Sequence, residues 1–125
     1  MIVPAFLLRR LYVRGSLRHT EHGFEFDIKN TLGGGYAQGM LPLKIDGAEV
    51  PLEEAAFRHG EAFVPFSAVS KERPFTLALN LTTTIRVDGR SLAEGNHKIE
   101  MGFVVVGLGR LSFDVTDYVA AGNDH

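Results

Sequence analysis

The stretch GFEFDIK, residues 23–29, decides the fold class. Within it, three apolar side chains alternate with three charged ones, with a period of two residues. Successive side chains of a β-strand point to opposite faces of the sheet. The alternation therefore predicts a strand that has one face in a hydrophobic core and the other in water.

The same alternation recurs along the chain and predicts further strands over residues 11–16, 43–45, 50–52, 75–87, 97–105 and 111–116. Asp46-Gly47 and Asp88-Gly89 predict turns, because Asp-Gly between alternating runs is a strong turn signal. Residues 51–56 and 65–71 are each long enough for only one helical turn. We therefore expect an all-β fold, an antiparallel β-sandwich of the immunoglobulin or fibronectin type with about seven or eight strands.

Length and composition limit the class of protein. With 125 residues, the chain is expected to form one domain, residues 1–125. The 13 basic and 15 acidic residues nearly cancel and form no basic block, so we expect no nucleic-acid partner. Cysteine is absent, which excludes disulfides and thiolate chemistry. The apolar run before Arg9 is too short to cross a membrane, and we expect a cytoplasmic protein.

The histidines are the first candidates for chemistry. His19, Glu21 and His22 lie within four positions, but side chains three apart on a strand point to opposite faces, so they would not share a metal ion. We interpret them as the polar rim of a turn that leads into the strand. His59 is expected at a hairpin tip. His97, just before a strand, is expected to bond a nearby backbone group.

Other catalytic signatures are missing. The sequence has no G-x-S-x-G nucleophile elbow, and Gly33–Gly35 is not followed by the Lys-Ser or Lys-Thr of a phosphate loop. Gly107–Gly109 lacks the third glycine of a dinucleotide site. Glu53-Glu54 is interpreted as solvated surface, and Asp114 and Asp117 as polar residues near an exposed strand end. We therefore expect no catalytic, cofactor-binding or metal-binding residue in this chain.

Apolar side chains are abundant for so small a chain. One group lies at residues 6–13, and a second comprises Phe57, Phe63, Phe66 and Phe75. Most of them are expected in the core. Part of them are candidates for contact with another chain, since exposed apolar clusters mark interfaces. The N-terminal segment 1–13 is the first such candidate.

Residues 43–52 and 84–100, with Gly23–Phe26 ahead of them, resemble the small β subunits of bacterial C-glycoside deglycosidases. The second segment contains the pattern Leu-x-x-Gly-x-His, with Leu92, Gly95 and His97. The resemblance extends over roughly residues 20–117.

The resemblance implies an accessory β subunit in a heteromeric carbon–carbon lyase. Its partner would be a TIM-barrel α subunit that cleaves the bond between a 3-oxo sugar and an aromatic aglycone in a 3-oxo-C-glycoside. That partner would hold a divalent metal, Mn or Mg, which polarises the sugar ketone. No catalytic residue is carried over onto this chain. Residues 19–23, 33–39 and 57–63 are the loops expected to approach the partner.

Two other functions stay open on the residues alone. The first is a non-catalytic β-sandwich that binds carbohydrate or protein. Such modules are commonly exported and linked to other domains, and this chain shows neither an export signal nor a linker. The second is a small enzyme that acts without a partner, which the missing catalytic motifs disfavour.

Overall fold

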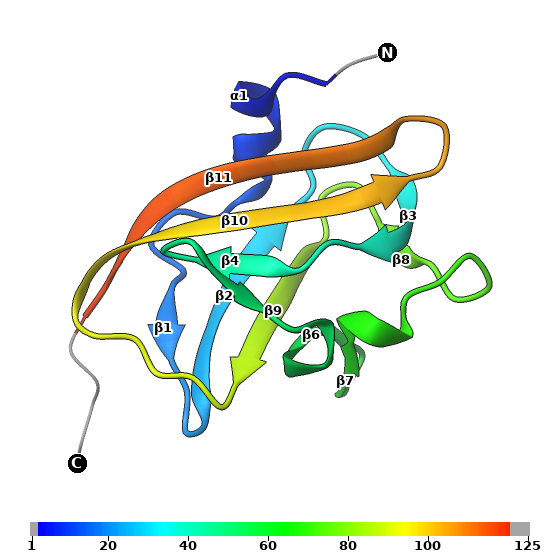
Figure 1. The fold of residues 1–125 in the computed structure, drawn as a ribbon. Coiled ribbons are helices and arrows are strands. Elements are labelled where there is room, and N and C mark those ends of the chain that lie inside the picture. The colour runs from blue at the N-terminus through cyan, green and yellow to red at the C-terminus, as the bar shows by residue number, and fades with distance from the viewer. Residues whose placement is uncertain (1–2, 121–125) are drawn as a thin grey trace.

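The computed structural model describes residues 3–120, and it forms two antiparallel sheets packed face to face (Figure 1). The expectation of an all-β sandwich is confirmed. The first sheet contains, in spatial order, β1 (Arg18–His19), β2 (Gly23–Lys29), β9 (Thr82–Asp88), β6 (Ala55–His59) and β7 (Ala62–Pro65).

The second sheet is built around the longest hairpin of the fold. Its strands are β10 (Gly95–Val105), β11 (Gly109–Val119), β3 (Gly35–Met40), β4 (Leu43–Ile45), β5 (Ala48–Val50) and β8 (Phe75–Leu77). One edge of β10 pairs with β11 along its whole length. The other edge pairs first with β4 and then with β3, so β3 and β4 are two pieces of one interrupted strand.

The sandwich has more strands than expected, eleven within the described residues. β1, β4, β5 and β8 have only two or three residues each. Alternation over so few residues carries little signal, although the hairpin expected at residues 43–52 is present as β4 and β5. The turn between them follows the prediction, because Asp46 and Gly47 both have positive φ, 53° and 87°. These values are typical of a two-residue hairpin turn.

The predicted strand at residues 11–16 is wrong. The chain forms the short helix α1 (Ala5–Leu8) and the 3-10 turn η1 (Arg9–Leu11). Leu8 and Leu11 share one face of this helical segment and are both buried. Residues 12–16 do not continue this helical segment: the Ser16 amide donates to the Val13 carbonyl, and Gly15 has a φ of 80°, so a turn interrupts the expected strand. Only an isolated bridge from Tyr12 to Ile28 continues the first sheet.

The predicted single strand over residues 75–87 is also wrong. β8 and β9 belong to different sheets, and a turn at residues 78–81 separates them. Asn80 has a φ of 63°, a conformation that asparagine adopts more readily than most residues. Asp88-Gly89 ends β9, but the chain then crosses to the second sheet instead of forming a tight hairpin. The two expected helical turns are confirmed as η2 (Leu52–Glu54) and η3 (Phe66–Ala68).

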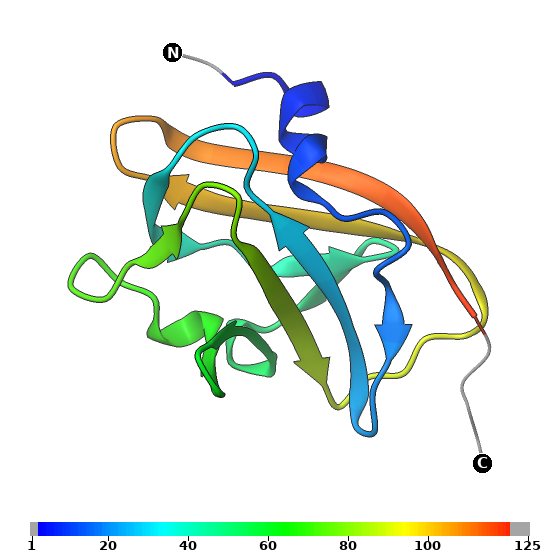
Figure 2. The ribbon, with the colours of Figure 1, turned by 180° about the vertical axis from the view of Figure 1, so that it is seen from behind.

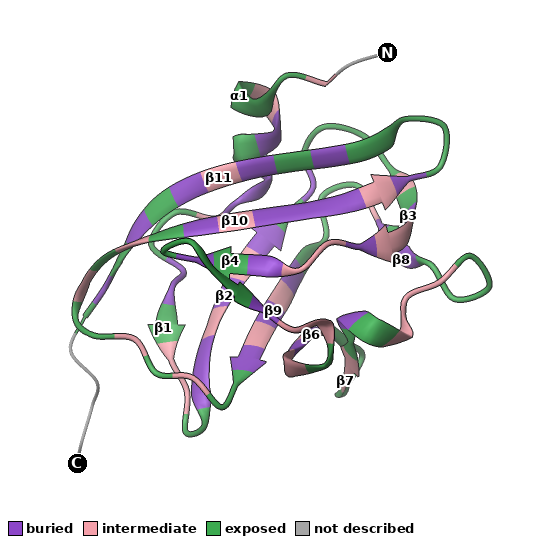
Figure 3. Ribbon diagram, viewed as in Figure 1, coloured by how far each residue is buried: buried purple, intermediate pink, exposed green. Residues whose placement is uncertain are grey.

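The core lies between the two sheets. Figure 3 shows buried and exposed residues alternating along β11, which faces the core on one side and water on the other. Phe24 and Phe26 on β2 are completely buried, and they contribute to the same core as Ile99 and Phe103 on β10. This continuous core fixes the register of the strands, since a shift of one residue would expose every apolar side chain.

Candidate functional site

The residues of the first histidine cluster are separated by the structure. His19 lies on β1, and its Nε2 is 2.9 Å from the carbonyl oxygen of Ala120. His22 is exposed in the turn that leads into β2. Within residues 3–120, no group of three or more His, Cys, Asp or Glu side chains is placed to hold a metal ion. The interpretation of this stretch as a turn that leads into a strand agrees with these positions.

His97 forms a clamp between two loops. Its Nε2 lies 2.7 Å from the carbonyl oxygen of Ala93, as expected for a histidine that bonds nearby backbone. Its Nδ1 lies 2.6 Å from Oδ2 of Asp46, in the β4–β5 turn. Both ring nitrogens therefore face acceptors, and the Ala93 carbonyl and the Asp46 carboxylate raise the pKa of His97. The hydrogen bond from His97 in turn lowers the pKa of Asp46.

The remaining candidate residues have structural positions. His59 is exposed at the end of β6, at the expected hairpin tip. Glu54 pairs with Arg90 at 3.1 Å, and Asp114 pairs with Arg9 at 3.3 Å. Asp117 differs from the expectation of an exposed strand end, because it is 9% exposed.

Asp117 is stabilised in this buried position by several donors. The Tyr12 hydroxyl donates to its Oδ2 at 2.7 Å, and the Gly15 amide donates to the same oxygen at 3.0 Å. The Tyr118 amide donates to Oδ1. Burial, followed by the bond to Asp117, raises the pKa of Tyr12 well above its ordinary value, so its hydroxyl stays protonated. The pair is a fixed structural contact between the N-terminal segment and β11.

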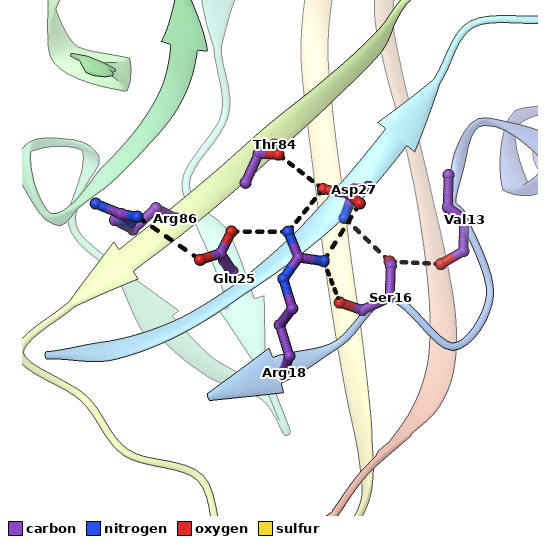
Figure 4. A network of polar contacts seen from close by, with 7 residues as sticks. All are labelled: Val13, Ser16, Arg18, Glu25, Asp27, Thr84 and Arg86. Carbon is purple, nitrogen blue, oxygen red and sulfur yellow. Dashed lines mark hydrogen bonds and ion pairs between the residues drawn. The ribbon is translucent and has the colours of Figure 1, made fainter. Parts of the chain in front are cut away.

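A second polar cluster covers the outer face of the first sheet (Figure 4). Arg18 Nη2 lies 2.7 Å from Glu25 and 3.1 Å from Asp27. Thr84 donates to Asp27, and Arg86 pairs with Glu25 at 3.6 Å. Each carboxylate thus has partners within the cluster. The arrangement joins β1, β2 and β9, and it leaves no free acid–base pair for catalysis.

Arg86 has a further contact in this cluster. Its guanidinium carbon lies 4.0 Å from the centre of the Phe63 ring, on β7. Its Nε is buried. Within the described part of the chain, this nitrogen has no hydrogen-bond partner. The ring face attracts the cation at this distance, which partly compensates the missing bond.

The clearest departure from an ordinary surface is one end of the sandwich, which we name the apolar end. Three loops meet there: residues 30–35, 78–81 and 106–108 (Figure 2). The described chain has eight large hydrophobic side chains that are exposed, and all but Phe6 and Tyr118 belong to this end. The six that define it are Leu32, Tyr36, Leu79, Leu81, Val106 and Leu108.

A cavity of about 340 Å³ opens at the apolar end, between the second sheet and the N-terminal helical segment. Its walls come from Val3 and Leu7 in the N-terminal segment, from Phe103 and Val105 on β10, and from the loop Gly33–Gly35. Among the described residues, none of those that line it carries an ionisable side chain. A volume at the low end of the usual range for small-molecule sites, with an apolar wall, suits a small apolar group.

Asn30 holds the loops of the apolar end in place. Its side-chain amide donates to the carbonyl oxygens of Gly33 at 2.6 Å and Leu77 at 2.8 Å. Its Oδ1 accepts from the Leu32 amide at 3.1 Å. Asn30 is itself 6% exposed, so these bonds form away from water. The cavity therefore has a defined wall and is not a gap between mobile loops.

Sequence reasoning found this end only in part. The expected contact loop 33–39 includes Gly33–Gly35 and Tyr36, and the structure brings them together with Val106 through the bond from its amide to the Tyr36 carbonyl. The loops 19–23 and 57–63 lie elsewhere. Leu79 and Leu81 were missed because they continue the alternation of β8. The signal that identifies them is Asn80, which marks a turn between them.

Within the described residues, no helix is long and apolar enough to cross a membrane. Residues 7–120 match the family model of the hydroxymethylglutaryl-CoA reductase N-terminal domain. No curated protein matches the chain.

The family match overturns the resemblance to C-glycoside deglycosidases, and with it the proposed lyase activity and the role in carbohydrate metabolism. Two of the features that suggested it have structural explanations. The hairpin at residues 43–52 has an ordinary two-residue turn. His97 of the Leu-x-x-Gly-x-His pattern bonds to the Ala93 carbonyl in its own loop. The matched residues extend over nearly the whole described chain, and the chain belongs to the hydroxymethylglutaryl-CoA reductase N-terminal domain family.

Proposed function

We propose that this chain is a non-catalytic subunit of a hydroxymethylglutaryl-CoA reductase and that it docks onto a separate catalytic subunit through the apolar end. The family supports the enzyme class. The exposed side chains of the apolar end support the docking: Tyr36, Leu79, Leu81 and Val106 are each more than half exposed. Exposed apolar clusters of this kind mark contacts with other proteins.

The polar groups of the described chain support a non-catalytic role. The carboxylates Glu25, Asp27 and Asp117 are held by structural partners. His97 bridges two loops through both ring nitrogens. A catalytic acid or base needs a free side to meet its substrate. The reduction itself is therefore assigned to another part of the enzyme.

A protein partner was expected from the sequence, and it is kept here as a proposal. The TIM-barrel shape of that partner, its Mn or Mg ion and the 3-oxo-C-glycoside followed from the overturned resemblance and have no independent support in this chain. A cytoplasmic location also stays a prediction.

Affinity purification of the tagged chain from its native host tests the docking. The expected result is co-purification of a protein that reduces hydroxymethylglutaryl-CoA. A Leu79→Glu/Val106→Glu variant is expected to lose at least about nine-tenths of that activity, because charges desolvated in an apolar contact are costly. The control is Tyr118→Glu, which places one such charge on an exposed position at the opposite end of the β10–β11 hairpin from residues 106–108.

Two results would overturn the proposal. One is the absence of reductase activity from material bound to the wild-type chain. The other is equal activity with the wild-type chain and the double variant. Sedimentation of the purified chain tests a third case. If the wild-type chain is a dimer and the double variant is a monomer, the apolar end is a contact between two copies of the chain.

A further inference from the structure

A second cavity, of about 570 Å³, opens on the side of the molecule where β7 and β8 are the edge strands of their sheets (Figure 1). We name it the side cavity. Its apolar walls come from both sheets and from the segments that connect them: Phe57, Val64, Ala68, Pro74, Phe75 and Leu81. The rings of Phe57 and Phe75 join the two sheets, with their centres 4.5 Å apart. The volume lies within the usual range for small-molecule sites.

The geometry of the strands decides which polar side chains face the side cavity. Side chains two residues apart on a strand lie on the same face. His59 therefore shares a face of β6 with the buried Phe57. Thr83 on β9 also points inward, since it is only 8% exposed. Arg58 lies on the opposite face of β6, where its guanidinium carbon is 5.4 Å from the centre of the Phe63 ring.

Thr83 is a buried polar residue at the wall of the side cavity. Its neighbour Thr84 donates to Asp27, whereas no group within residues 3–120 bonds to the Thr83 hydroxyl. Burying a hydroxyl without a partner costs free energy, and most buried polar groups have one. The fold gives this hydroxyl no partner, and an occupant of the side cavity would supply one.

The polar lining of the side cavity indicates what that occupant presents. Besides Thr83 and His59, it includes Thr76 and Arg73, and no lining residue is acidic. Arg73 is exposed in the loop before β8 and has no ion pair within the described chain. A guanidinium only donates hydrogen bonds, and hydroxyl and imidazole groups can donate. A carboxylate accepts from all three, and its bonds to a guanidinium are among the strong ones.

We propose that the side cavity binds a small aromatic carboxylate. Its ring would pack against Phe57, Phe75 and Val64, since aromatic rings gain from contact with one another beyond the area that they bury. Its carboxylate would accept from the Thr83 hydroxyl, with Arg73 as the opposite charge. The proposal goes beyond the docking function and does not depend on it, because all these residues belong to this chain.

Titration of the purified full chain with 2-naphthoate tests this binding, by calorimetry and by amide chemical shifts. Saturable binding at one site is expected, with the largest shifts at residues 57–59, 73–76 and 83. 2-Naphthamide has the same rings without the charge, and it is expected to bind at least about tenfold more weakly.

Two arginine variants form a matched pair. Arg73→Gln removes a positive charge from the side cavity and is expected to weaken binding of 2-naphthoate about tenfold. Arg58→Gln removes the same charge from the opposite face of β6 and is expected to retain binding within about twofold. Both residues are exposed, so both variants should fold, which circular dichroism checks.

Two threonine variants test the free hydroxyl. Thr83→Val removes it with little change of shape and is expected to weaken binding about fivefold. Its thermal midpoint should not fall below that of the wild type, because no hydrogen bond of the fold is lost. Thr82→Val makes the same change at an exposed position on the other face of β9 and should bind 2-naphthoate within about twofold of the wild type.

The proposal is wrong if 2-naphthoate does not saturate a single site, if 2-naphthamide binds as tightly, or if the two arginine variants bind equally. A lower thermal midpoint for Thr83→Val would show that its hydroxyl serves the fold, and would remove the anchor for the ligand. No partner protein is present in these titrations. A chain that binds 2-naphthoate but co-purifies with no reductase would therefore retain the ligand site and lose only the docking function.

Discussion

Phe24 is the residue on which the core depends most directly. Its side chain is completely buried on β2, between the two sheets. Replacing it with alanine removes a ring and leaves a cavity, and we expect Phe24→Ala to lower the free energy of unfolding by about 3–5 kcal/mol. Urea denaturation measures this loss. Phe6→Ala is the control, since Phe6 is 65% exposed and its removal should cost less than about 0.5 kcal/mol.

His97 makes stability depend on pH in a definite direction. Its pKa is raised in the folded chain, first by the Ala93 carbonyl and then by Asp46. A raised folded pKa means that the stabilisation is fully present below the unfolded value of about 6.5 and is lost as the pH rises through the folded value. We expect the wild-type chain to exceed His97→Gln in unfolding free energy at about pH 6.

The two proteins should then converge as the pH rises above the raised pKa of His97. Urea denaturation of both at several pH values gives this difference directly. A difference that stays constant from acid to alkaline pH would show that His97 acts through packing and not through its charge.

At the residue scale, the environment of His97 was predictable only in part. Its position before a strand predicts a bond to nearby backbone, and Ala93, four residues away, supplies it. Asp46 lies 51 positions away, and only the pairing of β4 with β10 brings it close. The burial of Asp117 was not predicted for the same reason, because its donor Tyr12 is 105 positions away.

Among the elements, β11 presents a long outer edge that side chains cover. Arg9 Nε donates to the Asp114 carbonyl at 2.8 Å, Arg14 to the Thr116 carbonyl at 3.2 Å, and His19 Nε2 faces the Ala120 carbonyl. α1 also lies against this strand (Figures 1 and 2). Uncovered strand edges pair with other chains. The N-terminal segment therefore protects the sandwich from edge-to-edge association.

Removal of this cover should be visible as self-association. We expect Arg9→Ala/Arg14→Ala to sediment as larger species as its concentration rises, because the carbonyl groups of β11 become available for pairing. Arg10→Ala is the control, since in the described chain Arg10 makes no such bond. Sedimentation velocity at several concentrations separates the two. A double variant that stays as monomeric as the control would mean that α1 alone covers the edge.

The start of β2 requires glycine for a packing reason. A Cβ at Gly23 would overlap the carbonyl oxygen of Val87, on the paired strand β9. The backbone cannot move aside as a side chain can. Gly23→Ala should therefore lower the free energy of unfolding by about 1–3 kcal/mol. Gly33→Ala is the matched control, because a Cβ there meets nothing within 4 Å. Equal thermal unfolding of the two variants would contradict this account of β2.

At the element scale, strands with long alternation were predictable, and short ones were predictable only beside a turn signal, as β4 and β5 are beside Asp46-Gly47. β2 and β10 have enough alternating residues to be found from the sequence. β8 and β9 were joined in error, because their alternation continues through the turn at Asn80 and the pattern contains no information about which sheet each strand joins. The N-terminal helix α1 has only four residues, too few to show a helical period in the sequence.

Over the whole molecule, both sheets share one continuous core. We therefore expect a single cooperative unfolding transition. Far-ultraviolet circular dichroism reports the strands, and tyrosine fluorescence reports Tyr12, Tyr36 and Tyr118, which lie in three different places. The two signals should give the same midpoint in urea. Separate midpoints would mean that one sheet or the N-terminal segment unfolds by itself.

The apolar end belongs to this largest scale, and this is why it was the hardest feature to predict. Its side chains come from three loops that are far apart in the sequence. Alternation assigned Leu79 and Leu81 to the core, whereas the turn at Asn80 leaves them exposed. The family was not found from the residues either, because the segments that carried the false resemblance are common features of β-sandwiches.

The contact between the N-terminal segment and β11 has a consequence for synthesis on the ribosome. Tyr12 and Asp117 are 105 positions apart, as are Arg9 and Asp114. At about 5–20 residues per second, the ribosome needs roughly 5–20 seconds to translate that interval. During this time Leu8 and Leu11 have no β11 to pack against, and they are available to chaperones that bind nascent chains. Closure of the sandwich is therefore a late event, completed only when β11 has emerged.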